Sequence, residues 1–312
     1  ERRFANDAFR HEALFRGDLL LAHSAAHRTS AGIQYAWRRL SLTGEVTDTR
    51  AVAPWAQEPI VETYRPYLPI APSLIRNLLS LYGEHTFRPL SWLAFDAGGR
   101  GQFDASSSQL TGSGRIAAAV TLPTMTVLKI SSGLALQPIS RPLTLDRSLG
   151  NPNLSPERSV QLIAAVEQPL PIEALVRVEG WSKWLSHLVV NPDSRESLDA
   201  RLGAGQPAFA NLGSGRAYGV DGMMVGRARH WAYTLGLGAL RSDRSNPLAA
   251  GLQTYAVQWE QQFSAAASVS WSPNRQWIDT ARANFRTGRQ YTPVAEFTRS
   301  EPERRFETYF GS

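Results

Sequence analysis

The chain has 312 residues, of which 43% are hydrophobic and 19% are charged, and it contains nine Trp, nine Tyr and twelve Phe but no Cys. This much large apolar surface excludes a disordered protein, and the lack of cysteine excludes disulfide scaffolds, thiolate metal sites, iron–sulfur clusters and cysteine nucleophiles. The formal net charge of +6 comes from scattered arginines, with no more than two in a row, rather than from basic runs, which argues against a nucleic-acid partner.

No stretch of about 18 consecutive apolar residues occurs in the sequence. An ordinary transmembrane helix is therefore excluded. A membrane-spanning β-strand is not excluded, because such a strand is apolar on one side only.

Apolar and polar residues alternate along most of the first half of the chain, which is the pattern of strands with one apolar face. The alternation predicts strands at 12–22, 31–43, 77–87, 90–103, 112–122 and 125–136. The region from Ser73 to Leu79 is the one place where we expect a short helix.

Two strands with the same alternation are predicted in the middle of the chain. The strand that starts at Glu157 has an apolar face made by Val160, Leu162, Ala164 and Val166, and a polar face made by Ser159, Gln161 and Glu167. The next strand has an apolar face made by Val176, Val178 and Trp184, and a polar face made by Arg177, Glu179 and Lys183. Both segments are long enough for a tilted strand to cross a bilayer, which takes about 9 to 11 residues.

The last third of the chain continues the pattern, with weaker strands at 213–226, 275–287 and 304–311. From Trp231, the apolar face contains Trp231, Tyr233, Leu235, Leu237 and Ala239. From 259 to 271, it contains Trp259, Phe263, Ala265, Ala267, Val269 and Trp271. The whole sequence thus predicts about thirteen strands.

The predicted strands are joined by tight turns that alternate with long polar loops, the longest at 44–76, 137–156, 188–212 and 243–256. Short turns at one end and long loops at the other are typical of an up-and-down sheet threaded through a membrane. We therefore expect an all-β fold, namely an antiparallel up-and-down transmembrane β-barrel or a large part of one. We expect residues 1–312 to form a single region.

The two faces of the predicted strands differ in a way that favours lipid on one side and water on the other. Small residues such as Ala265 and Ala267 lie between terminal aromatics, as in a lipid-facing band with an aromatic girdle, so Trp259 and Trp271 would lie at opposite interfaces. The charged face would line a watery lumen. Its candidate solute-contacting residues are Arg115, Arg177, Glu179, Lys183 and Arg282. The alternative, which we prefer for these five residues, is ordinary charge pairing inside a solvated barrel.

The sequence contains no motif for catalysis, a metal or a cofactor, so we expect neither an enzyme nor a bound cofactor. Ser113 and Ser214 lie between glycines but lack the spacing of a nucleophile elbow. His23 and His27 are four residues apart, but they fall at a strand end and in a turn rather than on a helix, so no metal site is expected there.

Four segments resemble motifs of the TonB-dependent outer-membrane receptors, in the order in which that family carries them. The first is Gly150-Asn151-Pro152-Asn153-Leu154-Ser155-Pro156-Glu157, which is similar to G-N-P-x-L-x-P-E. The second runs from Asn211 to Asp221 and contains Ala217-Tyr218-Gly219-Val220. The third, Trp259-Glu260-Gln261-Gln262-Phe263, resembles F-D-Q-x-H in degraded form. The fourth is Thr287-Gly288-Arg289-Gln290-Tyr291-Thr292-Pro293, which is similar to T-G-x-P-Y-T-P.

The resemblance covers residues 75–295 best, and it implies a β-barrel in the outer membrane of a Gram-negative bacterium. It further implies uptake of a small ligand such as a siderophore, cobalamin or a glycan, with outer-membrane lipid and a TonB-type energy complex or other envelope proteins as partners. Nothing in the sequence resembles the family's plug domain, and the family's barrel has 22 strands.

Two alternatives follow, one from the missing plug domain and the smaller number of strands, and one from the alternation itself. The first is a plugless structural barrel within an envelope complex. The second is a soluble all-β carbohydrate-binding or hydrolytic protein. Carboxylates about 5 to 9 Å apart on neighbouring strands would indicate the second, together with Trp259 and Trp271 packed in a core.

Overall fold

The structure is a computed structural model that describes residues 7–47, 67–70, 73–105, 107–139, 151–190, 209–248, 254–257, 260–274, 276–288, 294–300 and 305–310. The described residues form β-strands joined by turns and irregular connections. They include no helix that is long and apolar enough to cross a bilayer.

The strands are long and follow one another closely along the chain. They are β1 (Asp7–Ala22), β2 (His27–Thr47), β3 (Tyr67–Ile70), β4 (Ser73–Leu90), β5 (Leu93–Asp104), β6 (Gln109–Thr121), β7 (Val127–Gln137), β8 (Glu157–Leu170), β9 (Ala174–Val190), β10 (Ala210–Ala228), β11 (Trp231–Ser245), β12 (Thr254–Ala256), β13 (Phe263–Asn274), β14 (Trp277–Arg286), β15 (Val294–Ser300) and β16 (Arg305–Phe310).

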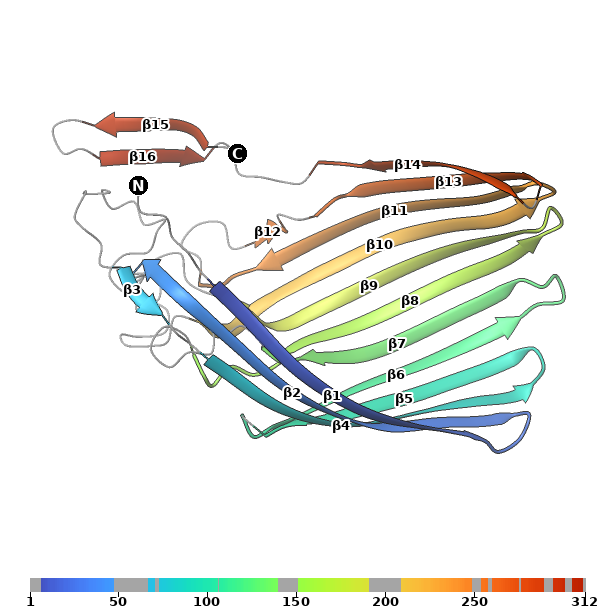
Figure 1. Cartoon of the computed structure of the whole chain (residues 1–312), viewed down its shortest axis with the longest axis horizontal. Coiled ribbons are helices and arrows are strands. Elements are labelled where there is room, and N and C mark those ends of the chain that lie inside the picture. Colours follow the sequence, from blue (N-terminus) through green and yellow to red (C-terminus); the bar gives the residue numbers. More distant parts are fainter. Residues whose placement is uncertain are drawn as a thin grey trace.

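The main sheet is antiparallel and up-and-down, because each long strand pairs with the next long strand along the chain. Its order is β1-β2-β4-β5-β6-β7-β8-β9-β10-β11-β13-β14, with β3 added beside β2 and β12 beside β11. Among the described strands, β1 and β14 are the two edges, so the sheet is open. It is strongly curved (Figure 1). β15 and β16 pair only with each other, in a separate hairpin.

Tight turns and longer connections lie at opposite ends of the sheet, which we call the turn end and the loop end (Figure 1). The turn end joins β1 to β2, β4 to β5, β6 to β7, β8 to β9, β10 to β11 and β13 to β14. Three of these turns contain a non-glycine residue with positive φ, namely Met125, Glu173 and Arg229. The predicted alternation of short and long connections is thus confirmed, with the short β5–β6 connection at the loop end as an exception.

The predicted fold class is confirmed, but two local expectations near residue 75 are wrong. Ser73 to Leu79 is not a helix and forms the start of β4, where continuous pairing with β2 runs from Ser73↔Ser41 to Phe87↔His27. This long-range pairing overrides the local helical spacing. For the same reason, the expected loop 44–76 contains the end of β2, all of β3 and the start of β4.

The strand registers separate the sheet into an apolar face and a polar face. On the apolar face Val166 of β8 lies opposite Val178 of β9, and on the polar face Glu167 lies opposite Arg177. The apolar sets expected from the sequence on β8, β9, β11 and β13 all fall on one face. Trp259 lies outside the described residues, and the described part of its segment forms β13 from Phe263.

The apolar face exposes large side chains that a water-soluble protein would bury. Ile130 is 54% exposed, Val220 is 53% exposed and Ile116 is 64% exposed. An apolar surface that extends over many strands is typical of an interface with lipid or with another protein. The apolar face therefore is not the core of a two-layer soluble fold within the described residues.

Candidate functional site

The polar face carries charged side chains on nearly every strand, and most of the described ones are paired across or along the strands. On β7, β8 and β9, Lys129 Nζ lies 2.7 Å from Glu167 Oε1, and Arg177 Nη1 lies 3.6 Å from the same oxygen. Arg177 also forms an ion pair with Glu179. The result is a chain of alternating charges across three neighbouring strands.

A second set of pairs joins side chains of β1, β2 and β4. Arg38 Nε lies 2.7 Å from Glu12 Oε1, and the Tyr82 hydroxyl donates to Asp18 at 2.5 Å. These side chains are exposed to solvent, which screens their charges and leaves each pair weak. Their joint effect is to keep this side of the sheet hydrated.

One ion pair on the polar face is buried. Arg76 of β4 and Asp104 of β5 have side chains that are only 6% and 5% exposed. The Arg76 guanidinium donates from Nε to Asp104 Oδ2 at 2.7 Å and from Nη1 to the Ile139 carbonyl at 2.9 Å. This pair ties the loop end of β4 and β5 to the segment that follows β7.

All five candidate solute-contacting residues lie on the polar face, but the structure does not gather them into one site. Arg115 of β6 pairs with Glu84 at 2.6 Å, and Arg177 pairs with Glu179. Lys183 Nζ lies 5.1 Å from the centre of the Trp181 ring. Arg282 lies on β14 opposite Ser268, far along the sheet from Arg115. Their contact with a solute remains a prediction.

Trp181 is a polar-face residue that the sequence reasoning did not single out. Its indole Nε1 donates to Asp221 Oδ2 at 2.6 Å. The ring occupies space beside Gly219, where an added Cβ would lie 2.8 Å from Trp181 Cζ2 and 2.6 Å from the Ala239 carbonyl oxygen. The signal was present in the sequence, because Trp181 is in phase with Arg177, Glu179 and Lys183 rather than with the apolar set.

This arrangement gives the Tyr218-Gly219-Val220-Asp221 segment a structural explanation. Tyr218 and Val220 lie on the apolar face, whereas Gly219 and Asp221 lie on the polar face opposite Trp181 and Glu179 of β9. Gly219 leaves room for the Trp181 ring, and Asp221 accepts its N–H. The motif thus joins β9 and β10 from the polar side.

Glu179 and Asp221 are carboxylates on neighbouring strands, which is the feature expected of a hydrolytic protein. Each has its own donor, Arg177 for Glu179 and Trp181 for Asp221. Trp271, which that alternative would place in a core, is 40% exposed on the apolar face. Trp259 lies outside the described residues. The arrangement therefore favours structural pairing over catalysis.

The segment that resembles G-N-P-x-L-x-P-E forms a clamp at the loop end, made by residues 151–157 and Asn211. Asn211 Nδ2 donates to the carbonyls of Ser155 at 2.9 Å and His187 at 2.8 Å, and its Oδ1 accepts from Ser155 N at 2.8 Å. Leu154 is 3% exposed. The clamp fastens the approach to β8 onto β9 and β10.

Other residues of the same segment complete the clamp. Asn151 Nδ2 donates to the Phe209 carbonyl at 2.9 Å, and Glu157 Oε1 accepts from Val189 N at 3.0 Å. Gln109 Nε2 of β6 donates to the Leu154 carbonyl at 3.1 Å. Pro152 and Pro156 lie between these contacts, and Gly150 lies outside the described residues.

The fourth motif is described only in part. Thr287 closes the loop end of β13 and β14, because its N donates to the Phe263 carbonyl at 3.0 Å and its Oγ1 accepts from Phe263 N at 3.1 Å. Gly288 is exposed, and Tyr291 and Pro293 lie outside the described residues.

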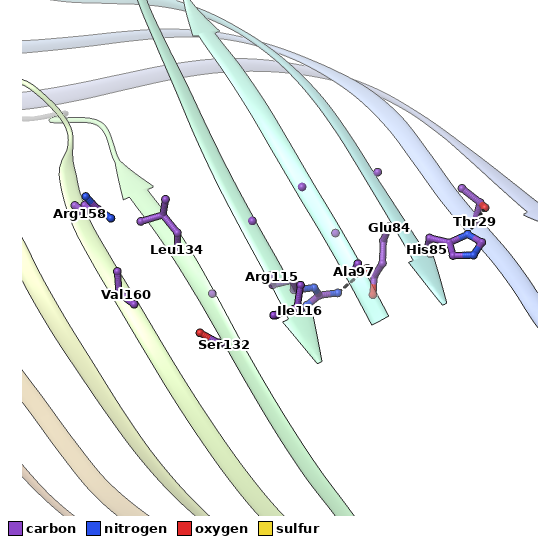
Figure 2. A pocket seen from close by; sticks show the side chains of 15 residues that line it. Thr29, Glu84, His85, Ala97, Arg115, Ile116, Ser132, Leu134, Arg158 and Val160 are labelled. Carbon is purple, nitrogen blue, oxygen red and sulfur yellow. Dashed lines mark hydrogen bonds and ion pairs between the residues drawn. The ribbon is translucent and has the colours of Figure 1, made fainter. Parts of the chain in front are cut away.

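A shallow hollow of about 800 Å³ lies where β4 to β7 present small residues (Figure 2). Gly83, Gly99 and Gly114 are successive cross-strand partners on the apolar face, and an added Cβ at any of them would meet nothing closer than 3.6 Å. No contact at these three positions therefore requires glycine. Gly98 is tighter, because an added Cβ there would lie 3.3 Å from the Gly83 carbonyl oxygen and 3.5 Å from Glu84. Glu84 forms an ion pair with Arg115 (Figure 2).

The histidines near the turn end are linked by hydrogen bonds. The Thr29 hydroxyl lies 3.0 Å from His23 Nε2 and 2.9 Å from His85 Nδ1, and His27 Nδ1 lies 3.2 Å from His85 Nε2. In the part of the chain that the structure describes, no group of three or more His, Asp or Glu side chains is arranged to hold a metal ion.

No protein-family model and no curated protein matches the sequence. Solved structures do match the fold. The ferric yersiniabactin uptake receptor FyuA from Yersinia pestis matches with a TM-score of 0.63 at 12% identity, over 91% of this chain and 44% of that chain. The ferric-catecholate import receptor Fiu from K12 E. coli matches with a TM-score of 0.62 at 10% identity, over 89% and 44%.

A third match is the siderophore receptor PirA from Pseudomonas aeruginosa, with a TM-score of 0.57 at 12% identity, over 89% of this chain and 47% of that chain. The chain thus spans less than half the length of each of these three structures. By fold, the chain corresponds to part of the β-barrel of the TonB-dependent outer-membrane receptors.

Proposed function

We propose that the chain forms part of the wall of a β-barrel uptake receptor in the outer membrane of a Gram-negative bacterium. The observation that carries this proposal is the division of the sheet into two faces. Large apolar side chains are exposed on one face, and paired charges cover the other. A barrel wall between lipid and a watery lumen has this division.

The proposed cargo is a small ligand such as a siderophore, cobalamin or a glycan. The neighbouring structures are named as receptors or transporters for a siderophore, ferric catecholate, ferric yersiniabactin and copper. For this chain, the lumenal candidates are Arg115, Arg177, Glu179, Lys183 and Arg282. We propose outer-membrane lipid as one partner and a TonB-type energy complex or other envelope proteins as further partners, with no nucleic acid and no enzymatic reaction.

The membrane proposal is tested on the full-length protein. We expect it to require detergent for solubility, to give a β-sheet circular dichroism spectrum, and to migrate differently on gels before and after boiling. A monodisperse protein in detergent-free buffer would contradict the proposal and would favour the soluble all-β alternative.

The uptake proposal is tested by saturable binding of ferric enterobactin, cobalamin and Cu²⁺ to cells that express the protein from its full reading frame. Replacing a lumenal cation that contacts the ligand should weaken binding on the order of tenfold, as for one lost charge-assisted hydrogen bond. We therefore expect Lys183→Gln or Arg282→Gln to weaken binding of the ligand that is taken up. Arg88→Gln is the matched control, because Arg88 is an exposed arginine at the turn end of β4.

Correct insertion in the membrane without saturable binding of any of the three probes would contradict uptake of these ligands. It would favour the plugless structural barrel instead.

A further inference from the structure

The apolar face carries three arginines at the loop end of neighbouring strands, in a cluster that we call the arginine rim. Its members are Arg158 of β8, Arg216 of β10 and Arg241 of β11. The registers place Arg158 opposite Ser186, Arg216 opposite Trp184 and Arg241 opposite Tyr218. The three side chains therefore occupy three successive rows, with Arg216 roughly 12 Å from Arg158 and roughly 8 Å from Arg241, and the outer two roughly 20 Å apart, at about 3.3 Å per residue and about 4.8 Å per strand.

On β8, β10 and β11, the arginines of this face are confined to the loop end. Towards the turn end, the same face of β10 carries Tyr218, Val220, Gly222 and Met224. A cationic side chain on a lipid-facing strand costs about 2–4 kcal/mol at the middle of the bilayer but only about 0–1 kcal/mol near its surface. The arginines lie where that cost is lowest, at the level of lipid head groups.

Two aromatic rings hold Arg216 in place. Its guanidinium carbon lies 5.3 Å from the centre of the Tyr218 ring and 6.0 Å from that of Trp184. Both rings lie on the apolar face and are more than 40% exposed. Such rings are the girdle that marks the membrane surface, so the Arg216 guanidinium is fixed at that surface.

Among the described residues, one carboxylate balances part of the positive charge of the rim. Arg241 Nε lies 3.4 Å from Asp243 Oδ2, with side chains that are 63% and 31% exposed. Neither Arg158 nor Arg216 forms an ion pair with a carboxylate among the described residues. Within the described part of the chain, three guanidinium groups thus face one carboxylate, and N–H donors of Arg158 and Arg216 are not used by an ion pair there.

We propose that the arginine rim binds the phosphate groups of an anionic lipid head group in the outer leaflet. Guanidinium groups match phosphate oxygens in a paired geometry, and clustered basic residues at a membrane surface attract anionic lipids. The lipid's acyl chains would lie along the apolar residues below the rim. This inference rests on the proposed membrane location and adds a lipid site on the outer wall.

The test measures binding of diphosphoryl lipid A to the full-length protein in neutral detergent micelles. The variant carries Arg158→Gln, Arg216→Gln and Arg241→Gln together. We expect the variant to bind about 100-fold less tightly or weaker, because each of the three lost arginines removes about a fivefold contribution at the membrane surface. A variant with unchanged affinity would overturn the proposal.

A second variant with three turn-end arginines replaced serves as the matched control, with Arg88→Gln, Arg227→Gln and Arg229→Gln. This control variant loses the same charge and should keep wild-type affinity for lipid A. An equal loss of affinity in both variants would show that net charge alone controls binding, and it would contradict a specific site.

Two further arms identify the ligand. A phosphate-free lipid A should bind the wild-type protein as weakly as diphosphoryl lipid A binds the rim variant. Inorganic phosphate in large excess should compete only weakly with diphosphoryl lipid A for the wild-type protein. Efficient competition by inorganic phosphate would mean a simple anion site and would contradict a lipid site.

The gel shift on boiling is recorded for every variant, so loss of the fold is distinguished from loss of the lipid. A wild-type protein that needs no detergent would instead defeat the proposed membrane location itself.

Discussion

The contact between Trp181 and Gly219 shows how single residues join two strands from the polar side. We expect Gly219→Ala to destabilise the protein by about 1–3 kcal/mol, because the new methyl group would overlap the Ala239 carbonyl and the Trp181 ring. The measurement is thermal unfolding in detergent, followed by circular dichroism.

Gly222→Ala is the matched control for that substitution. Gly222 lies on the same strand, and an added Cβ there would meet nothing within 4 Å. This variant should be as stable as the wild type or slightly more stable, since alanine restricts the unfolded chain more than glycine does. Equal destabilisation by both substitutions would show that the Trp181 contact does not matter.

The buried pair of Arg76 and Asp104 supports a second prediction at this scale. Asp104→Asn should cost about 3–5 kcal/mol, because it leaves the Arg76 guanidinium buried without a counter-charge. Glu84→Gln, which breaks the exposed pair with Arg115, should cost less than about 1 kcal/mol. The free energy of unfolding of both variants is measured by the same unfolding experiment. Similar decreases in the two variants would contradict the prediction that burial makes the Arg76–Asp104 pair the more costly one to break.

At the residue scale, the sequence predicted which side chains share a face but not which of them touch. Alternation alone places Arg177 and Glu179 on the polar face, because the side that a residue faces depends only on its position within its own strand. The pairing of Arg76 with Asp104 depends on the register between β4 and β5, which local sequence does not encode. The hydrogen bond from Trp181 was missed because alternation places this residue on the polar face but does not identify Asp221 of the neighbouring strand as its acceptor.

The clamp at the loop end is an element-scale feature formed by the segment that resembles G-N-P-x-L-x-P-E. Asn211→Ala removes three hydrogen bonds that hold Ser155 and His187, so we expect it to destabilise the fold by about 1–3 kcal/mol. Asn153→Ala, which changes an exposed residue of the same segment, should have little effect. The measurement is the yield of heat-modifiable protein in membranes, and equal yields would contradict the clamp.

Deleting residues 151–158 should impair assembly more than any step of ligand binding. The segment contacts β6, β9 and β10 through Gln109, Val189 and Asn211, so its loss affects the wall directly. Binding per folded molecule, measured after purification of the heat-modifiable fraction, should be unchanged. Normal assembly of the deleted protein would contradict the structural role of the segment.

Element prediction was most accurate where both ends of a strand have turn signals and least accurate near β4. The tight turn at Leu122 to Thr126 was recognisable from its sequence, and the strands on either side begin and end close to the expected residues. The start of β4 has no such signal, and its extended form depends on pairing with β2. Long-range pairing therefore accounts for the wrong helix and for the overestimated loop.

The two-faced sheet gives a prediction for the whole molecule. Ile130 lies on the apolar face of β7 and Ser131 on the polar face of the same strand. Ile130→Lys should reduce the free energy of unfolding in bilayers by about 2–4 kcal/mol, whereas Ser131→Lys should be tolerated because its side chain faces water. Both variants are measured by unfolding in lipid vesicles. Equal tolerance of the two would be the result for a soluble sheet, and it would contradict a lipid-facing wall.

The up-and-down order of the main sheet also has a consequence for how the chain folds. Among the described strands, apart from short β3 and β12, each strand pairs only with its immediate neighbours along the chain, so each pairing joins two consecutive strands. Chains with such local contacts close small loops first and tend to fold rapidly for their size. The wall should therefore grow hairpin by hairpin from any formed pair, and a fault in one hairpin should stop growth there while leaving earlier hairpins intact.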